Sequence, residues 1–166
     1  MRNGFTFIEL LVVMVTMALL FGVGYAGYRD FQARQGIINV TRKVKIDLRL
    51  AQEYALSQRK LCSDNSTDSL IGYQVEVSTN SYEIFAVCDL PGGGPLDEIS
   101  IKTETIPTGF TLSRIPVDTI PRFNVLGRGV YIFPPAIGRP DMTIRVTDTN
   151  SGAISDIIIT STGEVR

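Results

Sequence analysis

The sequence predicts an α+β protein in which a long N-terminal helix packs on an antiparallel β-sheet or a small β-sandwich head. Three observations predict it. Residues 10–28 carry no charge, residues 37–55 repeat apolar positions at helical spacing, and the chain after residue 60 consists of short alternating runs separated by turn residues. A length of 166 residues suits one globular head rather than two.

The uncharged run predicts a membrane-inserting helix. Its nineteen residues, LLVVMVTMALLFGVGYAGY, hold only Thr16 as a clearly polar side chain. As a helix they would span roughly 28 Å, close to the hydrocarbon core of about 30 Å of a bilayer. We therefore expect residues 5–28 to form a transmembrane helix.

The helical pattern continues as an amphipathic segment over residues 29–60. Apolar or small residues recur there with gaps of three or four, which is one face of a helix, and no proline precedes Pro91. This face would pack on the sheet of the head. Its expected members are Ile37, Val40, Val44, Leu48, Ala51 and Ala55.

Residues 61–166 are expected to form the β-rich head. Val, Ile and Thr alternate with polar residues in short runs, as half-buried strands require. The segment 91–95 (PGGGP) is a loop within the head, too short for an interdomain linker. The expected strands cover residues 72–78, 82–88, 98–103, 110–115, 122–126, 130–133, 142–148 and 154–160.

Charge is partitioned along the chain. The 16 basic and 17 acidic residues nearly cancel, yet residues 29–60 sum to +5 and residues 61–166 to −6. An acidic head argues against nucleic acid as a partner. The absence of His excludes a Ser-His or Cys-His relay and any His-bearing metal site within the chain.

Glu9 interrupts the apolar N-terminus, where a carboxylate is costly unless a cation meets it. Residues 4–11, GFTFIELL, resemble the processing motif of type IV pilins and type II secretion pseudopilins. Arg2, Gly4, Phe5 and Glu9 match the family pattern, as do Thr6 and Ile8, whereas Phe7 replaces the commoner Leu and a mid-helix proline is absent.

The resemblance implies a processed filament subunit. A prepilin peptidase and N-methyltransferase would remove the leader 1–4 after Gly4 and methylate the new N-terminus at Phe5. Glu9 would pair with a subunit's N-terminal amine during assembly. Further partners would be other pilins or pseudopilins and the assembly platform of the inner membrane. The chain would cross the bacterial inner membrane once, with its head outside the cytoplasm, before entering a periplasmic pseudopilus or a surface pilus.

A second resemblance covers the head. Residues 50–55 (LAQEYA), 130–138 (VYIFPPAIG) and 157–166 (IIITSTGEVR) are similar to the H-type pseudopilins and minor fimbrial pilins. This similarity implies a structural, non-enzymatic subunit of a tip or initiation complex, without a cofactor. The choice between a secretion pseudopilus and a type IV pilus stays open.

Two alternatives come from other classes. The small-x-small triplet 24–26 could end an ordinary signal peptide, so that a secreted β-protein would begin after Ala26. A DNA-binding competence pilin would use a basic C-terminal motif, but Glu164 stands in the matching stretch 163–166. Arg122, Arg128 and Arg139 are the other basic residues that could form a DNA patch.

The remaining candidates concern the start of the head. If the head lies outside the cytoplasm, Cys62 and Cys88 would form a disulfide; the alternative is two buried thiols that never meet. Asp64 and Asp68 are spaced like the start of a calcium loop, but the later glycine and bidentate glutamate are missing, so we expect no metal. No spacing of carboxylates or of Ser and Lys favours an active site.

Overall fold

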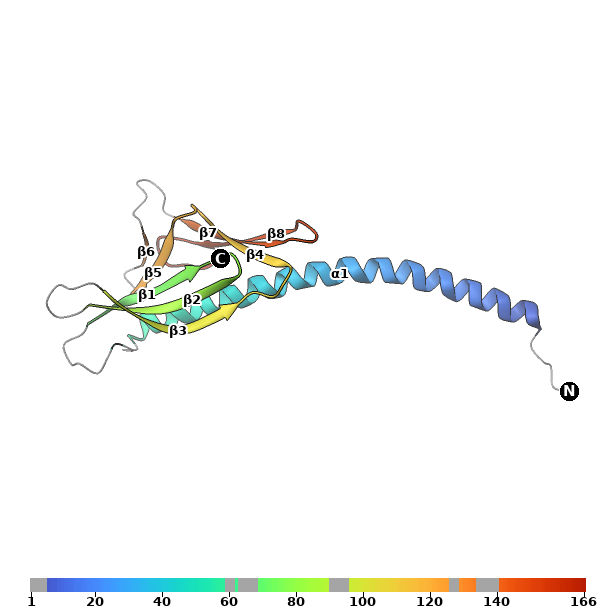
Figure 1. Cartoon of the computed structure of the whole chain (residues 1–166), viewed down its shortest axis with the longest axis horizontal. Helices are drawn as coiled ribbons and strands as arrows, with labels where there is room; N and C mark the ends of the chain where they lie inside the picture. The colour runs from blue at the N-terminus through green and yellow to red at the C-terminus, as the bar shows by residue number, and fades with distance from the viewer. Residues whose placement is uncertain (1–5, 59–61, 63–68, 90–95, 126–128, 134–140) are drawn as a thin grey trace. The chain divides into compact units, whose positions relative to one another are not determined.

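The computed structural model describes residues 6–58, 62, 69–89, 96–125, 129–133 and 141–166. These residues contain one helix and eight strands (Figure 1). The chain divides into two compact units, Met1–Gly36 and Ile37–Arg166, and all eight strands belong to the second.

Helix α1 extends over Phe7–Leu56. It ends where Gln58 adopts a positive φ of 51°, a left-handed conformation that typically closes helices. Its side chains are described without interruption over residues 7–22 and again over 34–56. The first stretch lies in the Met1–Gly36 unit, and only the residues from Ile37 onward contribute to the core of the second unit.

The predicted fold class is wrong in the form given above. Within the described part of the chain, no helix combines the length and the apolarity needed to cross a membrane. The predicted transmembrane first half therefore fails, and with it the predicted single-pass anchor in the inner membrane.

Antiparallel β-structure dominates the Ile37–Arg166 unit, in two sheets. A five-stranded sheet has the order β3-β2-β1-β5-β6 and a three-stranded sheet the order β4-β7-β8 (Figure 1). The strands of the first are β1 (Ser69–Val77), β2 (Ser81–Asp89), β3 (Asp97–Thr105), β5 (Ile120–Asn124) and β6 (Val130–Phe133). Those of the second are β4 (Phe110–Ile115), β7 (Met142–Asp148) and β8 (Ile154–Ile159).

Each of the eight alternating runs of the sequence corresponds to one of these strands. The largest difference is at the start of β1, which begins at Ser69 rather than at Gly72. A register shift between Leu70 and Gly72 marks a bulge in the β1–β2 pairing. A bulge inserts an extra residue and breaks the alternation, so the residues before it do not show the period of two.

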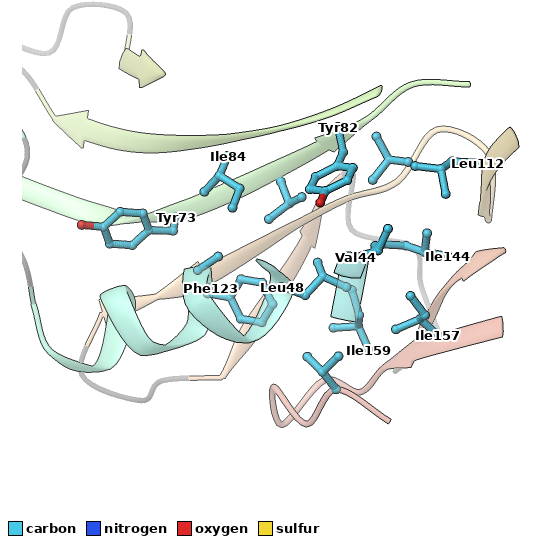
Figure 2. Close-up of a cluster of buried hydrophobic side chains, with 14 of the residues drawn as sticks. Val44, Leu48, Tyr73, Tyr82, Ile84, Leu112, Phe123, Ile144, Ile157 and Ile159 are labelled. Atoms are coloured by element: carbon cyan, nitrogen blue, oxygen red, sulfur yellow. The ribbon is translucent and has the colours of Figure 1, made fainter. Parts of the chain in front are cut away.

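The two sheets and the helix share one hydrophobic core. Val44 and Leu48 of α1 lie among side chains from both sheets, including Tyr73, Phe123 and Ile144 (Figure 2). Each fully buried side chain of this size contributes about 1.5–3 kcal/mol. All six residues expected on the buried helix face are at most 7% exposed: Ile37, Val40, Val44, Leu48, Ala51 and Ala55.

Candidate functional site

The start of α1 carries a capping arrangement built by Thr6 and Glu9. The Glu9 Oε2 atom accepts the backbone N–H of Thr6 at 2.9 Å and the Thr6 hydroxyl at 2.8 Å. An acidic side chain three residues after a threonine is the signature of a capping box. Glu9 thereby satisfies the helix end of its own chain while its carboxylate stays exposed. Gly4 and Phe5, the predicted processing residues, lie outside the described residues.

The first part of α1, from Phe7 onward, carries exposed apolar side chains on every side. Phe7 is 82% exposed, Leu20 74% and Phe21 75%. Large apolar patches on a protein surface mark places where another surface docks. The same exposure extends over Ile8, Leu10, Leu11, Val12, Val13, Met14, Val15, Met17, Leu19, Tyr25, Tyr28 and Phe31.

A second notable cluster joins α1 to the five-stranded sheet through a buried carboxylate. Asp47 is only 4% exposed. Its Oδ2 accepts the Tyr82 hydroxyl at 2.5 Å, and its Oδ1 lies 2.8 Å from the Lys102 ammonium. Glu104 extends the cluster, because it pairs with Lys102 at 3.4 Å and with Lys43 of α1 at 2.6 Å. Two cations and two carboxylates thus alternate, so that the buried charge is compensated.

The pKa shifts in this cluster follow from its geometry. Burial, and then the hydrogen bond to Asp47, raise the pKa of Tyr82 far above its usual range. The hydrogen bond to Asp47 also raises the pKa of Lys102. The Lys43 ammonium lowers the pKa of Glu104. Tyr82 therefore stays a neutral phenol in the neutral pH range, which suits a fixed structural link better than proton transfer.

Sequence reasoning did not single out Asp47, although a signal for its burial was present. Asp47 follows Val40 by seven residues and precedes Ala51 by four, so it shares their face of the helix. The residues that compensate it, Tyr82 and Lys102, are 35 and 55 positions away. Their contact could not be foreseen from local spacing.

Cys62 and Cys88, the two cysteines of the chain, form a disulfide with a Cα–Cα distance of 5.9 Å. Cys88 lies in β2, next to Asp89 at its end, and both cysteines are buried in the hydrophobic core. The bridge ties the segment after α1 to the end of β2. In the chain-entropy model a closed loop of this length stabilises the fold by about 3.5 kcal/mol.

The other sequence-predicted candidates are not brought together. Arg122 donates a hydrogen bond to Gln74 at 3.0 Å, whereas Arg128 and Arg139 lie outside the described residues. Arg166, in the C-terminal stretch, pairs with Glu164 at 2.8 Å. The acidic turn 64–68 and the loop 91–95 also lie outside the residues that the structure describes.

Ligand-type sites are sparse in the described part of the chain. Within it, no group of three or more Cys, Asp or Glu side chains could hold a metal ion. A groove of about 320 Å³ beside β4 has Arg114 as its one charged lining residue among those described. A smaller hollow of about 110 Å³ near the end of α1 is lined without any charged side chain among those described.

Comparison of the chain with protein-family models, with curated proteins and with solved structures found no match.

Proposed function

We propose that the chain is a structural, non-enzymatic subunit of a type IV pilus or type II secretion pseudopilus, cleaved after Gly4 by a prepilin peptidase. The observation that carries the proposal is the combination at the N-terminus: a pilin-like GFTFIELL sequence followed by a helix that is apolar on all sides. The occupant of this apolar surface would be the corresponding helix of other pilins.

The energetics favour such packing. Each large side chain between Phe7 and Phe21 that moves from water into a helix bundle gains about 1.5–3 kcal/mol when fully buried. A helix exposed on all sides can contact several neighbours at once, as a subunit inside a filament must. A compact monomer would leave this surface in water.

Glu9 has two roles to reconcile in this proposal. In the single chain its Oε2 accepts both bonds from Thr6, and no described residue donates to Oε1. Oε1 is therefore the atom that would receive an N-terminal ammonium from a neighbouring subunit. A buried carboxylate is tolerated only with such a counter-charge, so the pairing would select the correct axial register of two subunits.

Mass spectrometry of the N-terminus of the protein isolated from its host tests the processing step. We expect a chain that begins with methylated Phe5. A chain that retains Met1, or one that begins at Gly27, would overturn the proposal, the second in favour of a secreted β-protein.

Two variants separate the capping role of Glu9 from pairing with an amine. Glu9→Gln retains an acceptor for Thr6, because glutamine also serves in a capping box, but it removes the charge. Glu9→Ala removes both. If the ion pair drives assembly, both variants are processed and both fail to enter filaments. Normal incorporation of Glu9→Gln would show that Glu9 acts only as a cap.

A further inference from the structure

The outward face of α1 within the Ile37–Arg166 unit combines exposed apolar and basic side chains. Ile38, Arg42, Lys45, Ile46 and Arg49 fall within an arc of about 100° at 100° per residue, away from the arc that faces the core. Ile38 is 45% and Ile46 57% exposed. We call these five residues the basic stripe; Glu53 marks its end.

The cations of the basic stripe are not neutralised within the described part of the unit. Arg42 and Lys45 have no ion pair there, in contrast to neighbouring Lys43, which pairs with Glu104. Arg49 donates one hydrogen bond of 3.3 Å to the carbonyl of Val165 and meets no carboxylate among the described residues. The stripe therefore offers positive charge, without an ion pair among the described residues, beside two exposed isoleucines.

The same unit carries a surface of opposite sign where β2 ends and β3 begins. Asp89 is the last residue of β2 and Asp97 the first of β3, and Cys88 pairs with Asp97 in the strand register. Glu98 follows, exposed, with a single long hydrogen bond of 3.5 Å from Gln74. None of the three carboxylates forms an ion pair with a described residue. We call Asp89, Asp97 and Glu98 the acidic end.

We propose that the basic stripe of one copy docks on the acidic end of a second copy. The two surfaces are complementary in charge, which steers association and fixes register, while Ile38 and Ile46 supply the apolar centre that a stable contact needs. Because the two surfaces differ, the contact is heterologous. An assembly of copies then has a free basic stripe at one end and a free acidic end at the other. Such head-to-tail contacts extend into open filaments unless they close into a ring.

This inference goes beyond the proposed function, since it requires no cleavage after Gly4 and no role for Glu9. Zero-length cross-linking with a carbodiimide tests the contact in the full chain. Equal amounts of ¹⁵N-labelled and unlabelled protein are mixed, treated and digested. We expect mixed-isotope peptides that join Lys45 to Asp97, Glu98 or Asp89. Lys45 joined only to other carboxylates, or to none, would overturn the proposal.

Charge exchange gives an independent test by sedimentation equilibrium. We expect Arg42→Glu with Lys45→Glu, and separately Asp97→Lys with Glu98→Lys, to weaken self-association of the full chain about tenfold or more. The chain with all four changes should recover to within about threefold of the original. Asp118→Lys, an exposed charge change outside the acidic end, is the control and should leave association unchanged.

The rival occupant of a basic stripe is a polyanion such as duplex DNA. If DNA is the occupant, only Arg42→Glu with Lys45→Glu weakens the binding of added DNA. Asp97→Lys with Glu98→Lys then leaves self-association unchanged, and the variant with all four changes restores nothing. That pattern would overturn the contact between copies. If instead the exchange restores association while Met1 is retained, the proposed processing fails and this contact stands.

Discussion

Replacing Asp47 by alanine tests whether the buried carboxylate anchors α1 to the five-stranded sheet. The change removes the acceptor of the Tyr82 hydroxyl and the partner of the Lys102 ammonium. Tyr82 is 2% exposed, so water cannot replace the lost acceptor without opening the core. We therefore expect a stability loss larger than that of any exposed ion pair in the molecule that the structure describes.

The size of the stability loss follows from the two partners of Asp47, which are Tyr82 and Lys102. An unsatisfied buried hydroxyl costs about 1–3 kcal/mol. The Lys102 side chain is 32% exposed and still has Glu104 at 3.4 Å, so its ammonium can be rehydrated and adds at most about 1 kcal/mol. The sum is about 1–4 kcal/mol, which lowers the Tm of a unit of this size by about 4–15 °C.

Urea and thermal denaturation followed by circular dichroism measure the change. Asp156→Ala is the matched control, because Asp156 pairs with Arg145 at 2.8 Å with both side chains 37% exposed, and its loss should cost at most about 1 kcal/mol. Tyr82→Phe combined with Asp47→Ala should cost less than the sum of the two single changes, by about 1 kcal/mol or more. The reasoning is refuted if Asp47→Ala costs no more than Asp156→Ala, or if the two changes are additive.

Three further predictions concern the Ile37–Arg166 unit. Gly72→Ala should destabilise it by about 1–3 kcal/mol in urea denaturation, because the new Cβ would lie 2.4 Å from the backbone oxygen of Phe123; an unchanged midpoint would contradict this close approach. Replacing Cys62 and Cys88 by serine should lower the free energy of unfolding by about 3.5 kcal/mol, and reduction of the original chain should reproduce the loss; equal stability with and without reductant would be inconsistent with a structural bridge. Burial raises the pKa of Tyr82, so above about pH 10 the folded chain keeps a proton that the unfolded chain loses. The contribution of Tyr82 to stability is therefore complete below that pH and falls as the pH rises further. The fall should be smaller in Tyr82→Phe, and an equal fall in both proteins would show that Tyr82 is not its cause.

Much of the local structure could be predicted from neighbouring residues. Val44 and Leu48 stand at helical spacing in the sequence and both are buried. The alternation in residues 142–148 (MTIRVTD) likewise corresponds to β7, in which every second residue is buried. Such patterns are readable because a helix or a strand repeats its environment every 3.6 or two residues, whatever its partners are. The transmembrane prediction is wrong, since no helix in the described part of the chain is both long and apolar enough to cross a membrane.

The candidate site was only partly readable for the same reason. The N-terminal motif is contiguous, so Glu9 could be singled out, but its hydrogen bonds to Thr6 required the helix to be seen. The burial of Asp47 depends on Lys102, which lies 55 residues further along the chain. Arg122 was one of three arginines that could have formed a DNA-binding patch, whereas in the fold it donates to the buried Gln74.

The sequence by itself determined where the helix and strands lie, which faces they bury, and that the N-terminus has a pilin-like motif. Only the tertiary structure decided the strand order β3-β2-β1-β5-β6 and β4-β7-β8, the compensation of Asp47, and which charges stay unpaired on the basic stripe and the acidic end. The physical reason is the range of the interactions: periodic burial acts between neighbours in the chain, whereas strand pairing and ion pairs join residues that are distant in the chain and depend on how the whole unit packs.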